Sequence, residues 1–215
     1  MTARAAPPEL LALSPGDLSP ETAGSWLARA RAAVGAGLSG ILLREPALED
    51  GPTLRLACEL RSALGRGSHW LGVHDRVHVA LAAGADAVHL GFRSLEPRVV
   101  RALVGERLAV GFSSHAPDGP QAWEGADYLF FGPVFRTPAK AGLAEPLAPT
   151  GLEGLAARAR ETALPLWGIG GIDPARAARV IAAGARGVAV RGGIFAAPGR
   201  PPEEGARAYL EALLA

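Results

Sequence analysis

The heptapeptide GADAVHL at Gly84–Leu90 joins the end of a predicted helix to the start of a predicted strand. Three more stretches repeat its order of a glycine, a short turn and an apolar run: GAGLSGIL at 35–42, GADYLF at 125–130 and GARGVA at 184–189. A glycine suits a helix C-terminus because the chain adopts a left-handed conformation there before it turns back into a sheet. Four copies of one helix-to-strand joint predict a repeated βα unit.

Short apolar runs follow these joints and recur between them. They predict eight strands, at Leu10–Ser14, Gly40–Arg44, Trp70–Val73, Ala87–Leu90, Leu108–Gly111, Tyr128–Phe131, Leu166–Ile169 and Gly187–Val190. Continuous apolar character, without alternation, is typical of parallel strands buried on both faces. Amphipathic stretches between them predict helices at Pro20–Val34, Thr53–Leu64, Arg76–Ala83, Glu96–Val104, Pro117–Glu124, Gly151–Thr162, Pro174–Ala183 and Pro202–Leu214.

Eight βα units predict an α/β fold of the (β/α)8 barrel type, with residues 1–215 forming a single domain. A doubly wound sheet is the alternative, but no Gly-x-Gly-x-x-Gly motif follows the first strand. The barrel is therefore the expected fold.

Composition excludes several classes of protein. With 49% hydrophobic and 20% charged residues and a net charge of +1, the chain is neither a long disordered protein nor a basic coat for nucleic acid. Cys58 is the only cysteine, so no intrachain disulfide forms, and its Ala/Leu-rich surroundings predict a core or half-buried position. No apolar run is long enough to span a bilayer, and no signal peptide is evident. We expect a cytoplasmic protein without nucleic-acid or membrane partners, and a homo-oligomer is possible.

Chemistry in such a barrel is expected at the carboxyl ends of the strands. That rule selects Arg44, Glu45, His74, Ser113 and His115, the loop at 132–141 within the long non-periodic stretch 132–150, and then Gly170, Gly171, Arg191, Gly192 and Gly193. The loop contains Thr137 and Lys140. Lys140 is the one lysine among 22 cationic side chains, which indicates a need for a compact ammonium group.

Two pairs of glycines, with Arg191 beside the second pair, predict a phosphate site. Gly170-Gly171 and Gly192-Gly193 follow the seventh and eighth strands, where bare backbone lets amide groups approach a phosphate closely. His115 follows two serines and is the predicted proton shuttle, because its ordinary pKa lies near neutrality. The histidines at 69, 78 and 89 are interpreted as packed or solvated. No spacing typical of a zinc site and no nucleophile elbow is found.

These residues resemble the superfamily of thiamine phosphate synthase and thiazole tautomerase, whose fold is a (β/α)8 barrel. The resemblance covers nearly the whole chain, in order, through Leu43–Glu45, Asp75–Val77, Gly84–Gly91, Gly111–His115, Asp127–Phe135, Thr137 with Lys140, Gly168–Ile172 and Gly187–Val190. The stretch from Asp127 to Ile172 is the most specific part of it.

Departures from the synthase pattern favour the tautomerase branch. The resemblance implies a synthase site for pyrophosphate and Mg²⁺ made of Gln-x-Arg-x-Lys after strand two, an Asn-Asp pair and an Asp after strand four. Here the first motif reads Leu42–Pro46 and keeps only Arg44. The pair reads His74-Asp75, and Ser94 stands in the stretch where the last Asp is expected. Mg²⁺ prefers oxygen ligands, and of the carboxylates that the resemblance implies for the metal site only Asp75 remains.

The expected function is therefore that of an isomerase resembling thiazole tautomerase, which aromatises thiazole phosphate carboxylate by moving protons without a metal. By resemblance, His115 is its acid/base, and the Arg44 guanidinium pairs with the substrate carboxylate. Glu45 either orients Arg44 or faces solvent. The alternatives are thiamine phosphate synthase, which couples a pyrimidine pyrophosphate to thiazole phosphate and needs Mg²⁺, and a non-catalytic paralogue that binds a phosphorylated ligand. No cofactor is expected otherwise.

Overall fold

Eight parallel strands close into a barrel in the computed structural model, which describes residues 6–65, 67–136, 151–195 and 199–214. The strands are β1 (Leu10–Leu13), β2 (Gly40–Leu43), β3 (Trp70–His74), β4 (Ala87–Leu90), β5 (Ala109–Ser114), β6 (Tyr128–Phe131), β7 (Leu166–Ile169) and β8 (Gly187–Val190). Each strand pairs with its neighbours in sequence, and β8 pairs with β1. The expected (β/α)8 barrel is confirmed.

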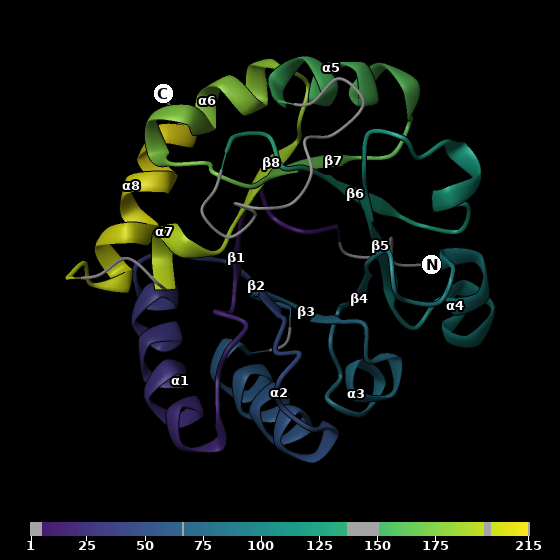
Figure 1. Ribbon diagram of the computed structural model, residues 1–215. Coiled ribbons are helices and arrows are strands. Elements are labelled where there is room, and N and C mark those ends of the chain that lie inside the picture. The colour runs from purple at the N-terminus through teal and green to yellow at the C-terminus, as the bar shows by residue number, and fades with distance from the viewer. Residues whose placement is uncertain (1–5, 66, 137–150, 196–198, 215) are drawn as a thin grey trace.

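The helices surround this ring of strands (Figure 1). They are α1 (Pro20–Gly35), α2 (Asp50–Leu64), α3 (Val77–Ala82), α4 (Pro97–Val104), α5 (Gly151–Glu161), α6 (Pro174–Ala182), α7 (Gly192–Phe195) and α8 (Pro202–Leu214), with a 3₁₀ turn, η1, at Pro120–Trp123. Among the described residues, no helix has the length and apolar character needed to cross a membrane.

The expected elements differ from the structure most clearly in three places. Strand β5 continues to Ser114 instead of ending at Gly111, and the helix expected at Pro117–Glu124 is only the short turn η1. Pro117, Gly119 and Pro120 account for the second difference, because proline lacks the N–H that a helix interior needs and glycine weakens a helix. The four-residue helix α7 was not expected, since so short a segment leaves no periodic pattern.

Each strand buries both of its faces, as its apolar run predicts. One face points into the barrel, where it forms a core with Leu11, Leu13, Leu42, Trp70, Ala87, Ala109, Tyr128, Phe130, Trp167 and Ala189. The other face packs against the helices in a larger core that includes Ile41, Val73, Val88 and Leu129. The alternation of side chains along each strand separates the two cores.

The repeated GAD stretches hold helix, turn and strand together in the same way twice. Asp86 accepts hydrogen bonds from the Leu71 backbone N–H at 2.7 Å and from the Arg61 guanidinium at 2.8 Å. Asp127, in the second GAD stretch, likewise accepts hydrogen bonds from the Val110 backbone N–H and from the Arg101 guanidinium. Each aspartate therefore fixes an arginine of an earlier helix to a strand of the barrel.

The glycine before Asp86 has the role that its position predicts. Gly84 follows α3 with a φ of +62°, in the left-handed region where a side chain is strained. One prediction nearby is wrong: Cys58 is exposed rather than core or half-buried. The Ala/Leu-rich composition of α2 concealed which of its faces is turned to solvent.

Candidate active site

The β2 end of the barrel presents Arg44 and a buried carboxylate beside it. The Arg44 backbone N–H donates to the hydroxyl of buried Ser14, 2.7 Å away and directly after β1. The Glu45 side chain is 3% exposed and accepts hydrogen bonds from the backbone N–H groups of Gly16 and Leu18, at 2.9 and 2.8 Å. Glu45 thus ties the β1–α1 loop to β2, and the interpretation that it faces solvent is wrong.

Two guanidinium groups converge above that loop. A Cβ placed on Gly16 would lie 3.4 Å from Nη1 of Arg44 and 3.9 Å from Nη1 of Arg191, which follows β8. No carboxylate of the described residues forms an ion pair with either arginine. Two positive charges that no described carboxylate pairs with, at one point of the mouth, favour an anionic ligand.

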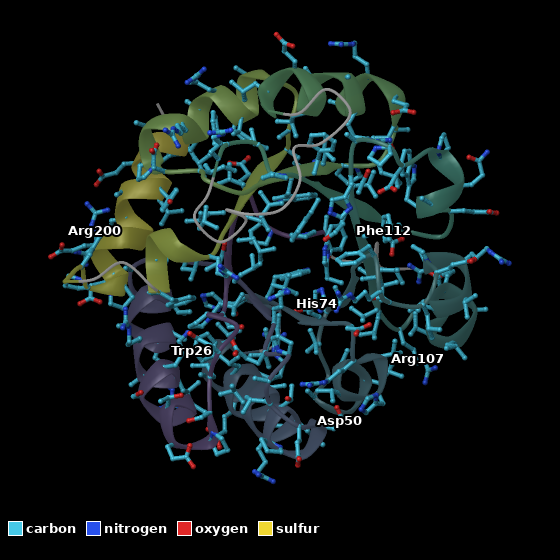
Figure 2. All side chains as sticks on the ribbon, viewed as in Figure 1. Trp26, Asp50, His74, Arg107, Phe112 and Arg200 are labelled. Atoms are coloured by element: carbon cyan, nitrogen blue, oxygen red, sulfur yellow. The ribbon has the colours of Figure 1, made fainter. Side chains whose placement is uncertain are left out.

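His74 is the last residue of β3 and lies on that side of the ring of strands (Figure 2). Burial, together with the positive charge of Arg44, lowers its pKa to about 4, so the imidazole is neutral at pH 7. The next residue, Asp75, is exposed and has a φ of +67°, which is strained for a residue with a side chain. Such strain is common where a backbone is fixed for function, and the sequence did not reveal it.

His115 lies at the end of β5 beside a carboxylate that the sequence analysis missed. Asp118 accepts a hydrogen bond from the His115 backbone N–H at 2.6 Å, and its Oδ2 lies 3.7 Å from the imidazole Nδ1. The buried Arg158 of α5 holds the His115 carbonyl at 2.9 Å. The His115 side chain remains 36% exposed, so it is accessible from the mouth. The His-x-x-Asp spacing was the signal for Asp118.

The glycine turn after β7 has a left-handed backbone that packs closely against the segment after β6. Gly170 and Gly171 have φ values of +100° and +63°, and a Cβ on Gly171 would overlap the carbonyl oxygens of Phe135 and Arg136. The turn accepts a hydrogen bond from the Phe135 N–H to the Gly170 carbonyl at 3.0 Å. Within the described ranges, no acceptor takes the amide protons of Gly170 or Gly171.

The turn after β8 packs against Tyr209 of α8, which also contacts the chain just beyond the β7 turn. A Cβ on Gly193 would overlap the hydroxyl of Tyr209, and that hydroxyl donates to the Ile172 carbonyl just beyond Gly171, at 2.7 Å. Burial raises the pKa of Tyr209 to about 12, so this donor keeps its proton at pH 7. Tyr209 of α8 thus links the two glycine turns, which the sequence analysis did not foresee. Gly192, by contrast, faces open space.

Ser113 and His89 form a polar contact inside the barrel. Ser113 is half-buried near the end of β5, and its hydroxyl lies 2.9 Å from Nε2 of the buried His89 of β4. His89 was interpreted as packed or solvated, and it is packed, with its ring 4.0 Å from that of Phe130. Thr137 and Lys140 lie outside the described residues.

The carboxyl ends of the strands therefore bring together Arg44, His74, Ser113, His115, Arg191 and both glycine turns, as the barrel predicts. No group of three or more His, Cys, Asp or Glu side chains that could hold a metal ion occurs among the residues described. What each residue does for a ligand stays a prediction. Arg44 and Arg191, together with the amides of the glycine turns after β7 and β8, make this mouth suitable for phosphorylated compounds.

Comparison with known proteins agrees with this chemistry. The family model described as "Thiamine monophosphate synthase" (TMP-TENI) matches residues 16–194. A Geobacter sulfurreducens protein named "Putative thiamine-phosphate synthase" is 41% identical over 189 residues, which are 87% of this chain and 86% of that protein. The thiamine-phosphate synthase of Laribacter hongkongensis is 42% identical over 177 residues, covering 80% and 82% of the two chains.

A solved structure gives the same answer for the fold. The thiamine phosphate pyrophosphorylase from Pyrococcus furiosus superposes with a TM-score of 0.81 at 27% identity, covering 96% of this chain and 95% of that one. These three relatives bear the synthase's name or that of a pyrophosphorylase, and none bears that of the tautomerase, so the expected tautomerase branch is unsupported. The resemblance to the superfamily is confirmed: the chain belongs to the thiamine monophosphate synthase family.

Proposed function

We propose that this protein is a thiamine-phosphate synthase, which couples a pyrimidine pyrophosphate to thiazole phosphate. The names of relatives about 40% identical over four fifths of the chain support this reaction. The geometric observation that carries the proposal is the presence of two features suited to anions at one mouth. Arg44 and Arg191 make one of them, and the glycine turns after β7 and β8, the second of which directly follows Arg191, make the other.

Two phosphorylated substrates need two such features. The glycine turns suit the monophosphate of the thiazole, because backbone amides can surround its oxygens. The paired guanidinium groups suit the more highly charged pyrophosphate, which departs with the bonding electrons when the new bond forms. In this arrangement Arg44 and Arg191 stabilise the leaving group, and His74, neutral at pH 7, adds no positive charge of its own.

The residues fit Mg²⁺ through one carboxylate. Asp75 is exposed at the end of β3, whereas both oxygens of Glu45 already accept backbone hydrogen bonds. Mg²⁺ is often held by one or two carboxylates together with substrate phosphates, so Asp75 and the pyrophosphate oxygens would hold the ion. When bound, Mg²⁺ would neutralise charge on the pyrophosphate. This proposal replaces the expectation that no metal is needed.

A second candidate, the thiazole tautomerase, is favoured by one observation. His115 is accessible at the mouth, with Asp118 beside its imidazole, which suits proton transfer on a bound ring. That reaction needs no metal. In it, Arg44 and Arg191 would face the carboxylate of the substrate, which is its only anionic group besides the phosphate. The two candidates share the phosphate site and differ in what these arginines bind.

The coupling reaction tests the first candidate directly. Purified protein is given both substrates with and without Mg²⁺, and thiamine phosphate is measured by chromatography. We expect product only with Mg²⁺, and we expect Asp75→Asn to raise the Mg²⁺ concentration needed for half the maximal rate. The exposed Asp17, on the β1–α1 loop, supplies the matched control Asp17→Asn. If Asp75→Asn leaves the Mg²⁺ dependence unchanged, Asp75 does not hold the ion.

A further inference from the structure

The interior of the barrel contains a hydrogen-bonded row of three side chains in an otherwise apolar core. The Tyr128 hydroxyl of β6 lies 3.3 Å from Nδ1 of His89, and Nε2 of His89 lies 2.9 Å from the Ser113 hydroxyl. Tyr128 and His89 are 0% and 1% exposed. Gly111 lies between Ala109 and Ser113 on the same face of β5, and a Cβ there would overlap both the Tyr128 hydroxyl and His89 Nδ1. The absent side chain leaves the space for this row.

The direction of each hydrogen bond follows from the donors and acceptors available. Burial raises the pKa of Tyr128 well above its usual value, so the phenol keeps its proton. Among the described residues, His89 Nδ1 is the only acceptor for that proton, and a buried donor without a partner is costly. Nδ1 is therefore the acceptor and carries no hydrogen.

The state of the second nitrogen is then fixed. Burial, with the nearby His74 and Arg44, holds the pKa of His89 well below its usual value, so the imidazole is neutral and carries one proton. That proton is on Nε2, which donates it to the Ser113 oxygen. The proton of the Ser113 hydroxyl consequently points away from His89, and within the described part of the chain no protein acceptor takes it.

We propose that His89 is a positioning residue, which Tyr128 fixes in one tautomer so that the Ser113 hydroxyl is held as a donor toward the mouth. Ser113 is on β5, across the ring from β1 and therefore from the guanidinium pair. Its hydroxyl then meets an acceptor atom in the ring portion of the substrate, on the side of the mouth opposite the guanidinium pair. The identity of that substrate rests on the proposed function; the tautomer of His89 does not.

Nitrogen NMR tests the tautomer without any substrate. Long-range ¹H–¹⁵N spectra distinguish an imidazole that carries its proton on Nε2 from one that carries it on Nδ1, and His89→Gln assigns the signals by their loss. At pH 7.5 we expect His89 as the Nε2–H form in the wild-type protein, and a mixture of tautomers in Tyr128→Phe. A charged imidazole or the Nδ1–H form in the wild type would overturn the proposal.

A double-mutant cycle tests the effect on function. His89→Leu removes the donor and should lower kcat/KM about ten-fold, as expected for the loss of one hydrogen bond. His89→Gln keeps an amide donor and should restore most of that loss. In a Ser113→Ala background, both substitutions should have almost no effect, because His89 then has no hydroxyl to hold. Independent effects that multiply would mean that His89 is only a packing residue.

The outcome separates this proposal from the proposed function. If the protein forms no thiamine phosphate, the Kd of thiazole phosphate is measured for the same set of variants. The protein is expected to bind this compound under both candidate functions. Non-additive effects on Kd would support the positioning role even without coupling activity, and additive effects would overturn it. His89→Leu leaves a buried phenol unpaired, which can impair folding. If that variant does not fold, the NMR result on the wild-type chain alone tests the proposal.

Discussion

The buried carboxylate of Glu45 accepts a hydrogen bond from the backbone N–H of Leu18 across 2.8 Å, between segments 27 residues apart in sequence. Its other oxygen accepts one from Gly16 at 2.9 Å. The side chain therefore replaces backbone pairing that the β1–α1 loop cannot make for itself. The loop that it holds contains Gly16, the point where Arg44 and Arg191 converge.

Removing this carboxylate should destabilise the protein. Glu45→Ala leaves one buried and one partly buried N–H group without acceptors, and we expect a loss of about 3 kcal/mol in the free energy of unfolding. Urea denaturation measures it. The exposed Glu49, four residues further along, supplies the control Glu49→Ala, which should change stability by less than about 0.5 kcal/mol. Equal effects for the two variants would show that Glu45 does not hold the loop.

The low pKa of His74, about 4, predicts a loss of stability in mild acid. An unfolded histidine titrates near 6.5, so between pH 6.5 and pH 4 the unfolded chain binds a proton that the folded protein excludes. Stability is complete above pH 6.5 and falls as the pH drops through this window. From pH 7.5 to pH 5.0 this residue contributes a loss of about 2 kcal/mol. Denaturation at both pH values should show His74→Gln losing about that much less than the wild type.

A substitution at Gly192 should weaken ligand binding without changing the stability of the fold. A Cβ there meets nothing within 4 Å, so Gly192→Ala should unfold at the same temperature as the wild type. The added methyl group lies where a phosphate would approach the backbone after β8, so the KM for thiazole phosphate should rise about ten-fold, as for the loss of one hydrogen bond. Gly24→Ala in α1, also in open space, is the control. An unchanged KM would place the phosphate elsewhere.

Arg191 is expected to act on only one of the two substrates. Arg191→Gln removes one of the two converging guanidinium groups and should raise the KM for the pyrimidine pyrophosphate about ten-fold or more. The KM for thiazole phosphate should change much less. Arg31→Gln, on the exposed face of α1, is the matched control for loss of one positive charge. If the thiazole phosphate KM rises instead, Arg191 belongs to the glycine phosphate site.

Local sequence signals predicted the fold because they repeat. The glycine joints recur at four of the βα units and the unbroken apolar strands at all eight, and the strand and helix boundaries mostly differ from the structure by a few residues. Errors arose where a signal was mixed, as in residues 117–120, where two prolines and a glycine interrupt an otherwise helical stretch. In α2, composition alone did not reveal that Cys58 lies on the exposed face.

The candidate site was predictable in its members but not in their contacts. Parallel strands in a barrel end at one mouth, so Arg44, His115 and the glycine pairs could be selected from sequence. The partners of Glu45 and His89, however, depend on which residues of distant segments meet when the barrel closes. Tyr128 and Ser113 flank His89 only because of the register between β4, β5 and β6. Nothing local in the sequence indicates such pairings.

The most direct test of the proposed function gives the same purified protein two reactions side by side. In one, pyrimidine pyrophosphate and thiazole phosphate are supplied with Mg²⁺; in the other, thiazole phosphate carboxylate is supplied alone. The synthase proposal predicts sustained formation of thiamine phosphate in the first reaction, and a His115→Ala variant that still binds thiazole phosphate. Aromatisation in the second reaction, abolished in His115→Ala and with no thiamine phosphate formed in the first, would contradict it.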